Sequence, residues 1–347
     1  MQRYAFQLIR HLDDILSKDL ESNQMKFILL VPRGHSLLIT PLTNIQIVEV
    51  SSPFGIFFWE QVQLPFYTWG NALLNLTGSA PLFKVLQYCT IHDAAIYEIS
   101  HAYTWKFLLW YKTLFFVQSR ICLSLFTVSE SSKFRLALHL KISPDRIRVI
   151  SNAAEHILEA NPDNRILEKF NLLYGSYFLT VGSANPSKNI NFLINAFLML
   201  HVDSRIKLVV VGGINNKVFA EKDNISYVSG SNVIYTGRIN DSELRSLYEN
   251  AKAFVFPSIY EGFGIPPLEA MSCGCPVLAS NFEAILEVCG DGAEYFDPSS
   301  TNSILNCLMR ALNEEGWLDK VRYKGLIRSK FYSWHSIAQN LLKNLST

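Results

Sequence analysis

The chain has 347 residues, 49% of them hydrophobic and 18% charged, which allows two domains with sizeable cores and argues against disorder. A formal net charge of +1 gives no general attraction for nucleic acid. The six cysteines show neither disulfide-framework nor zinc-ligand spacing, so we expect reduced, buried thiols in a cytoplasmic protein.

The first half of the chain opens on a helix, because apolar residues between Ala5 and Leu16 recur at helical spacing. Short apolar runs then predict buried strands at 26–31, 45–50, 85–91, 125–128 and 147–150. A doubly wound domain normally opens on a strand and a glycine-rich turn. Neither precedes the first helix here, so we expect the first domain to lack its first strand through a misassigned start or a real truncation.

The most hydrophobic stretch, "WKFLLWYKTLFFVQSRICLSLF", is interrupted by Lys106, Lys112 and Arg120, which makes it a poor membrane span. One interpretation is a helix packed against a sheet and followed by the strand at 125–128. The other is a helix whose aromatic and basic residues contact a membrane surface.

The second half repeats the alternation, with strands expected at 177–181, 206–211, 233–236, 253–256 and 276–279. The polar stretch 151–171 is interpreted as an interdomain link. The pattern predicts an α/β protein with two doubly wound, Rossmann-like sheets that face a ligand cleft.

The stretch "FVFPSIYEGFGIPPLEAMSCGCPVLAS" carries Glu261 and Glu269 in surroundings almost free of charge. A strand at 253–256, a glycine-containing turn and a helix that begins near Pro266 would place free N–H groups at the end of a strand. Such a helix start is an anion site, and neighbouring carboxylates can accept hydrogen bonds from sugar hydroxyls. Alternatively, Glu269 merely complements the helix dipole.

This stretch resembles the donor-site signature of the family-4 retaining glycosyltransferases (glycosyl transferases group 1), which have the GT-B fold. The E-x7-E spacing of Glu261 and Glu269 matches it, as do "YFLTVGSANPSKNINFLINAF", "LVVVGG" and "VIYTGRINDSELRSLYENAKAFVFPS". In the first half "TIHDAAIY", "FTVSESSKFRL" and "ISPDRIRVISN" match too. The resemblance implies an N-terminal acceptor-side domain at 1–160, a nucleotide-sugar domain at 161–330, and a terminal helix at 331–347 that crosses back.

The resemblance also implies roles for individual residues. Glu261, His92 and Lys188 would be catalytic, with Lys188 set against the diphosphate; on the residues alone, Lys188 is equally a solvated loop lysine. His92 and Asp93 would lie near the acceptor, although a lone histidine is more often structural. The donor contacts would come from Gly182, Ser183, Ser187, Lys188, Gly237, Arg238, Ile239, Phe263, Gly264, Ile265 and Glu269.

No D-x-D motif is present, so we expect no metal and no cofactor, with the leaving-group charge met by basic side chains and a helix end. Many members carry Arg where this chain has Ser183 or Ser187, which predicts weaker or rearranged phosphate binding. The resemblance implies retention of the anomeric configuration. Because no carboxylate is placed as a covalent nucleophile, we expect a front-face displacement.

These features predict a retaining glycosyltransferase that moves a hexose or deoxyhexose from a nucleotide sugar to a glycan or polyprenyl-linked acceptor. The subgroup resembled builds bacterial surface polysaccharide or O-antigen, which implies contact with the inner face of the cytoplasmic membrane. The alternative is an inactive nucleotide-sugar-binding remnant. Another two-domain enzyme of the same architecture, such as an epimerase or phosphorylase, has less support, since the sequence shows no pyridoxal-phosphate lysine environment of the kind that phosphorylases need. A dinucleotide oxidoreductase is weaker still, because no G-x-G-x-x-G follows a strand.

Overall fold

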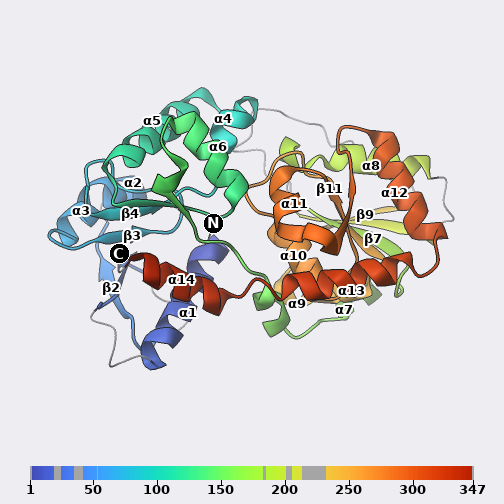
Figure 1. Cartoon of the computed structure of the whole chain (residues 1–347). Coiled ribbons are helices and arrows are strands. Elements are labelled where there is room, and N and C mark those ends of the chain that lie inside the picture. The colour runs from blue at the N-terminus through green and yellow to red at the C-terminus, as the bar shows by residue number, and fades with distance from the viewer. Residues whose placement is uncertain are drawn as a thin grey trace.

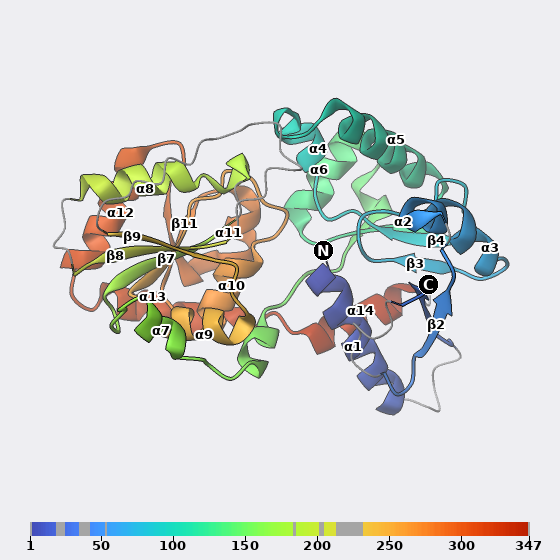
Figure 2. The same cartoon turned by 180° about the vertical axis from the view of Figure 1, so that it is seen from behind.

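The computed structural model describes residues 2–18, 25–34, 42–52, 54–182, 185–200, 205–212 and 232–345. Figures 1 and 2 show two lobes, each built around a sheet with helices on both sides. Helices α1 (Gln2–Lys18) and α14 (Trp334–Leu345) lie side by side against the first lobe, although they come from opposite ends of the chain.

The first lobe contains parallel strands in two groups among the described residues. Strand β1 (Ile28–Pro32) pairs with β2 (Gln46–Val50). A four-stranded sheet has the order β3-β4-β5-β6 and consists of β3 (Leu73–Asn75), β4 (Gln87–Thr90), β5 (Ser124–Thr127) and β6 (Ile147–Val149). Its connecting helices include α2 (Gly55–Phe58), η2 (Trp59–Gln63), α3 (Leu64–Tyr67), α4 (Ala95–Glu98), η3 (Ser100–Ala102), α5 (Trp105–Ile121), α6 (Glu130–Leu140) and η4 (Pro144–Arg146).

The second lobe has a six-stranded parallel sheet of order β12-β11-β10-β7-β8-β9. Its strands are β7 (Tyr177–Val181), β8 (Lys207–Val211), β9 (Val233–Gly237), β10 (Ala253–Phe256), β11 (Val277–Ser280) and β12 (Ala293–Phe296). The helices are η6 (Pro186–Lys188), α8 (Ile190–Met199), α9 (Asp241–Asn250), α10 (Ile265–Ser272), α11 (Glu283–Cys289), η7 (Gly290–Gly292), α12 (Thr301–Asn313) and α13 (Trp317–Ser329).

The strand order places a topological switch point between β7 and β10. From β7 the chain adds β8 and β9 on one side and then returns to add β10, β11 and β12 on the other. At such a point the two connections leave in opposite directions, so the carboxyl ends of the central strands face an open crevice. The segments that follow β7 and β10 therefore occupy the position where this class of sheet binds ligands.

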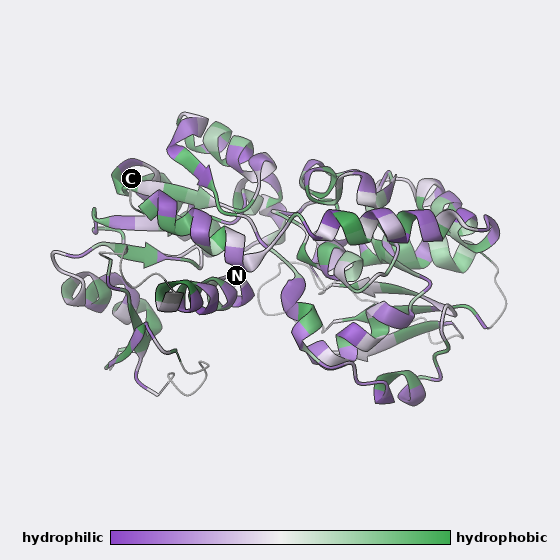
Figure 3. Ribbon diagram, turned by 60° about the horizontal axis from the view of Figure 1, so that its bottom comes forward, coloured by the Kyte–Doolittle hydropathy of each residue, from purple (hydrophilic) through white to green (hydrophobic). Residues whose placement is uncertain are grey.

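A continuous apolar core joins the two lobes. It contains Tyr4 and Leu8 of α1, Ile157 between the lobes, Leu268 of α10 and Trp334 of α14, all almost fully buried. Figure 3 shows the surrounding helices banded in green and purple, as expected when one helix face packs inward and the other meets solvent. This packing fixes α1 and α14 beside the start of α10.

The strands and the first helix agree with the sequence predictions, since each predicted strand overlaps an observed one. Strands β3 and β12 were not predicted; β3 has three residues, and β12, "AEYF", has only four, which include Glu294 and no Val, Ile or Leu. The stretch 151–171, interpreted as a link, also contains the short helices η5 (Glu155–Glu159) and α7 (Arg165–Lys169). The stretch 105–126 forms α5 and then enters β5, as the first of its two interpretations predicts.

Candidate functional site

Two oppositely charged side chains meet at the switch point. Lys188, the last residue of η6 after β7, places its Nζ 2.6 Å from Oε1 of Glu261, which follows β10. Their side chains are 22% and 14% exposed, so the pair is largely shielded from water. A shielded pair of this kind holds both groups in fixed positions, where each can also meet a polar ligand.

Gly182 lets the Lys188 segment approach the end of β7. A Cβ on Gly182 would lie 3.0 Å from Cδ1 of Ile190 and 3.3 Å from Cβ of Lys188. The amide of Gly182 donates to the carbonyl of Val211, which keeps the turn in register with β8. A larger residue at this position would displace Lys188 from Glu261.

The start of α10 depends on Gly264, the N-cap residue. Its φ of +113° is rarely adopted by other residues, and a Cβ would lie 2.7 Å from Cδ1 of Ile285. Because Pro266 and Pro267 have no N–H, the donors left at this helix start are those of Phe263, Gly264 and Ile265. The turn and the helix start thus follow the sequence prediction, and the binding of an anion there stays a prediction.

Gly262 brings the two lobes into contact. A Cβ on Gly262 would lie 2.9 Å from both the carbonyl oxygen of His92 and Cβ of Asp93. The carbonyl of Gly262 accepts hydrogen bonds from Ser129 Oγ at 2.6 Å and Ser132 Oγ at 2.9 Å. The turn that carries Glu261 is thus held directly against the first lobe.

Asp93 and His92 have separate partners. Oδ1 of Asp93 accepts a hydrogen bond from the amide of Ala95 at 2.8 Å, and within the described part of the chain no hydrogen bond joins Asp93 to the His92 ring. Burial raises the pKa of Asp93, and the negative charge of Glu261 adds to this, while Lys188 opposes it. Asp93 thus hydrogen-bonds its own loop and not the His92 ring, and it lies in the electrostatic field of the Lys188–Glu261 pair.

His92 is held as a neutral ring. Its Nε2 lies 3.0 Å from the carbonyl oxygen of Leu76, which can only accept, so Nε2 carries the proton. Burial lowers the pKa of His92 to about 4. The ring also contacts Tyr4 edge-on, with centroids 4.9 Å apart. At neutral pH, His92 can offer Nδ1 as a hydrogen-bond acceptor but no positive charge.

Glu269 is surrounded by side chains that the sequence analysis did not connect with it. Oε1 lies 2.7 Å from Arg3 Nη1 and 2.9 Å from His156 Nε2, and Oε2 accepts from the Tyr248 hydroxyl at 3.3 Å. Burial acts to raise the pKa of Glu269, but the hydrogen bond from His156 and the charge of Arg3 outweigh it, so the pKa is lowered. Glu269 is ionised and only 3% exposed.

Arg3 joins the two lobes at this point. Its Nη2 also lies 2.6 Å from Oδ1 of Asp241, at the start of α9. No sequence signal identified Arg3, His156 or Tyr248, because Arg3 and Glu269 are 266 positions apart and their pairing depends on the packing of α1. Arg3 is 37% exposed, so part of its guanidinium remains open to solvent beside Glu269.

The other predicted donor residues line the same edge of the sheet. Gly237 has a φ of +73°, and its carbonyl accepts from Gly212. Arg238 is exposed, whereas Ile239 packs partly against the core. Ser187 is buried, and its carbonyl accepts from Ile259 at 2.8 Å. Ser183 lies outside the described residues.

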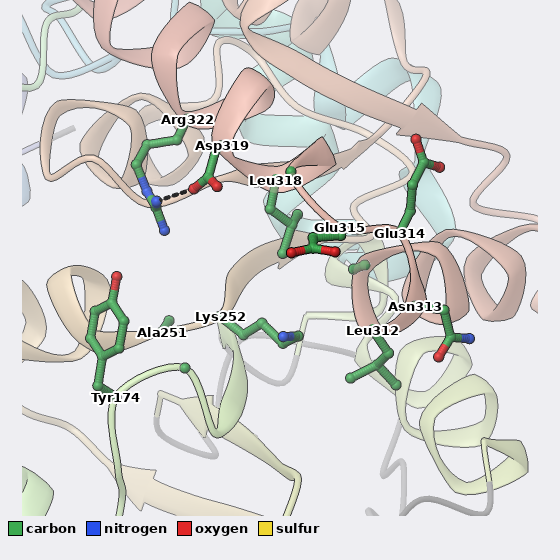
Figure 4. Close-up of a pocket in the computed structure, with 13 residues that line it drawn as sticks. Tyr174, Ala251, Lys252, Leu312, Asn313, Glu314, Glu315, Leu318, Asp319 and Arg322 are labelled. Carbon is green, nitrogen blue, oxygen red and sulfur yellow. Dashed lines mark hydrogen bonds and ion pairs between the residues drawn. The ribbon is translucent and has the colours of Figure 1, made fainter.

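Among the residues that the structure describes, no group of three or more His, Cys, Asp or Glu side chains is placed to hold a metal ion. A separate cavity of about 380 Å³ lies before β7 and β10, at the opposite edge of the sheet. Figure 4 shows Lys252, Asp319 and Arg322 around it, with Asp319 and Arg322 paired to each other. None of the predicted site residues lines this cavity.

Comparisons with known proteins relate this chain to glycosyltransferases. Residues 167–326 match the family model described as Glycosyl transferases group 1. O-antigen chain mannosyltransferase B of Escherichia coli is 32% identical over 217 residues, which are 60% of this chain and 57% of that protein. O-antigen chain mannosyltransferase RfbU of Salmonella typhimurium is 30% identical over 236 residues, 67% of this chain and 63% of that protein. The chain thus spans less than two thirds of the length of either relative.

The fold is shared with a solved structure of Anabaena HepE in complex with UDP and glucose. The two superpose with a TM-score of 0.71 and 15% identity, over 93% of this chain and 100% of that chain. At this identity the likeness concerns the fold alone. Together with the parallel sheets of both lobes, it confirms the predicted GT-B architecture.

Proposed function

Because residues 167–326 match the family model described as Glycosyl transferases group 1, we propose that this chain is a retaining, metal-independent glycosyltransferase. The single observation that carries the proposal is the Lys188–Glu261 pair, which lies at the switch point of the sheet beside the start of α10. The donor is a nucleotide sugar, and the transferred group is a hexose or deoxyhexose. Mannose is the first sugar to test, since the two relatives are mannosyltransferases.

Each part of the site has a task in this proposal. The amides of Phe263, Gly264 and Ile265 and the ammonium of Lys188 stabilise the departing diphosphate. Glu261 accepts a hydrogen bond from a hydroxyl of the transferred sugar, and Glu269 accepts one from a ribose hydroxyl. His92 and Asp93 face the acceptor from the first lobe.

The proposed reaction breaks the bond between the anomeric carbon and the diphosphate oxygen. The acceptor oxygen forms the new bond on the same face of the sugar, and its proton passes to an oxygen of the departing phosphate. Neutral His92 can hydrogen-bond the sugar or the acceptor without adding charge. Retention follows from attack on the face that the leaving group vacates.

The acceptor is a glycan or polyprenyl-linked glycan of surface-polysaccharide synthesis, reached at the inner face of the cytoplasmic membrane. Within the described part of the chain, no helix is long and apolar enough to cross a bilayer. Several aromatic side chains of the first lobe are exposed, and we call them together its outer aromatic surface: Phe54, Phe57, Phe66, Trp69, Phe83 and Trp105. Exposed Lys106 and Arg120 flank it on α5, which contains no acidic residue. Aromatic side chains with neighbouring positive charges suit an anionic membrane surface.

The test incubates the purified protein with radiolabelled GDP-mannose, UDP-glucose, UDP-galactose and dTDP-rhamnose in EDTA, with and without a bacterial lipid extract. We expect release or transfer of label from one donor, and its loss in Glu261→Gln. Exposed Glu315 is the matched control, and Glu315→Gln should retain activity. Donor binding without release or transfer in any sample would instead support the binding-only alternative.

A further inference from the structure

The carboxylate of Glu269 is connected to two residues that are themselves almost fully buried. His156, in η5 between the lobes, and Trp334, the first residue of α14, are 4% and 0% exposed. Trp334 Nε1 lies 3.2 Å from His156 Nδ1, and His156 Nε2 lies 2.9 Å from Glu269 Oε1. A chain of hydrogen bonds therefore runs from α14 through His156 to Glu269.

The chemistry of the indole fixes the direction of this chain. An indole N–H can only donate, so His156 Nδ1 must accept and carries no proton. The ring proton then lies on Nε2 and is donated to Glu269 Oε1. Arg3 Nη1 lies 2.9 Å from Nε2 as well, but two donors do not bond to each other, so its partner here is Oε1 at 2.7 Å.

This arrangement leaves the two oxygens of Glu269 unequal. Oε1 accepts hydrogen bonds from both Arg3 and His156, which use its two lone pairs. Among the described residues, Oε2 accepts a hydrogen bond from the Tyr248 hydroxyl, which leaves the second lone pair of Oε2 for a ligand. The rotation of the carboxylate, set from His156, decides which oxygen a ribose hydroxyl meets.

We infer that His156 and Trp334 are positioning residues for ribose recognition by Glu269. Trp334 holds the tautomer of His156, and His156 holds Glu269 with Oε2 directed to the nucleotide. The inference rests on the proposed function, because it presupposes that a nucleotide binds beside Glu269. It also makes the last helix of the chain part of the donor site, at a distance from any substrate.

The test compares the affinity of the protein for UDP and GDP with that for their 2′,3′-dideoxy analogues, measured by calorimetry. The ratio of the two dissociation constants isolates the ribose hydroxyls, and it does not depend on the fraction of protein that is correctly folded. We expect the wild-type chain to favour the ribonucleotide. Trp334→Phe and His156→Leu should each reduce this preference about tenfold, the usual effect of one lost hydrogen bond to a charged group.

Two further variants separate positioning from general stability. His156→Gln keeps an amide donor toward Glu269 and should restore most of the preference. Trp317→Phe is the matched control, because Trp317 is also buried and its Nε1 donates to a different carboxylate, that of Glu294. It should leave the ratio unchanged. For an active donor, the KM should rise with little change in kcat.

The outcomes distinguish a failure of the positioning role from a failure of the proposed function. An unchanged ratio in Trp334→Phe and His156→Leu, with the ribonucleotide still preferred, would overturn the positioning role and leave the proposed function intact. A wild-type protein that binds neither nucleotide would overturn both. A reduced preference in Trp317→Phe equal to that in Trp334→Phe would also contradict the inference, because it would show a general structural effect.

Discussion

The ammonium of Lys188 lies 2.6 Å from the carboxylate of Glu261, although the two residues are 73 positions apart in the chain. The parallel sheet causes this meeting, because β7 and β10 are neighbours whose carboxyl ends reach the same edge. Each of these charges neutralises the other. In the proposed function, the pair would hold Lys188 in place for the negative charge of a donor diphosphate.

Replacement of Lys188 by methionine should reduce kcat/KM at least about 100-fold, because a fixed positive charge beside the leaving group is lost. The measurement is initial rate against donor concentration. Lys252→Met provides the control, since Lys252 lies at the opposite edge of the sheet and lines the separate cavity. Equal activity of the two variants would remove Lys188 from the proposed mechanism.

The contact between Gly262 and the first lobe predicts a difference between adjacent serines. Ser132 Oγ donates to the Gly262 carbonyl, so Ser132→Ala should lower the free energy of unfolding by about 1 kcal/mol. Ser131 Oγ is buried without a hydrogen-bond partner among the described residues, and Ser131→Ala should be neutral or slightly stabilising. Urea denaturation of both variants checks this. If Ser131→Ala lowered the free energy of unfolding more than Ser132→Ala, this contact between Gly262 and the first lobe would be wrong.

The buried ring of His92 predicts a pH dependence of stability. Its pKa is lowered from 6.5 to about 4 in the folded chain. Between these values the unfolded chain binds a proton that the folded chain does not, so the free energy of unfolding falls as the pH falls from 6.5 towards 4. The His92 contribution is at most about 3 kcal/mol across this window. His92→Gln removes the titration and should flatten this part of the profile.

Urea denaturation at several pH values between 7.5 and 4.5 measures the difference between the wild-type chain and His92→Gln. Asp93 and Glu269 titrate in both proteins, so their contributions cancel to a first approximation. If the free energy of unfolding changed with pH in the same way in both proteins, His92 would be accessible to protons in the folded chain. This result would also contradict its assignment as a neutral hydrogen-bonding group.

The outer aromatic surface predicts binding to anionic vesicles. Trp69 and Phe83 are 84% and 91% exposed, so their replacement should affect membrane binding far more than folding. The double change Trp69→Ser and Phe83→Ser should weaken partition into phosphatidylglycerol vesicles at least about tenfold, since each ring contributes about 1.5–3 kcal/mol when buried. Flotation with vesicles measures the bound fraction.

The matched control for this surface is the double change Leu173→Ser and Tyr174→Ser. These side chains are also exposed, but they precede β7 in the second lobe. The control should bind vesicles like the wild-type chain. An equal loss of vesicle binding in both double variants would show that exposed apolar side chains in general cause the binding. Equally strong binding to vesicles of pure phosphatidylcholine, which carry no net charge, would exclude a role for Lys106 and Arg120.

Local patterns in the sequence determined the strands, the helix starts and the turn that carries Glu261. Apolar runs such as 177–181 and 253–256 are buried whatever their neighbours, and only glycine fits the backbone at position 264. The family resemblance of the second half rests on the same local features, and it is confirmed. Short strands without a run of Val, Ile or Leu, such as β12, did not give this signal.

Only the tertiary structure decided which side chains surround the candidate site. Arg3, His156, Tyr248 and Trp334 reach Glu269 from segments up to 266 positions away. Sequence periodicity reports which face of a helix is apolar, but it does not report which helix that face meets. The packing of α1 and α14 on the first lobe, and of η5 between the lobes, converts an isolated glutamate in the sequence into a buried, oriented carboxylate.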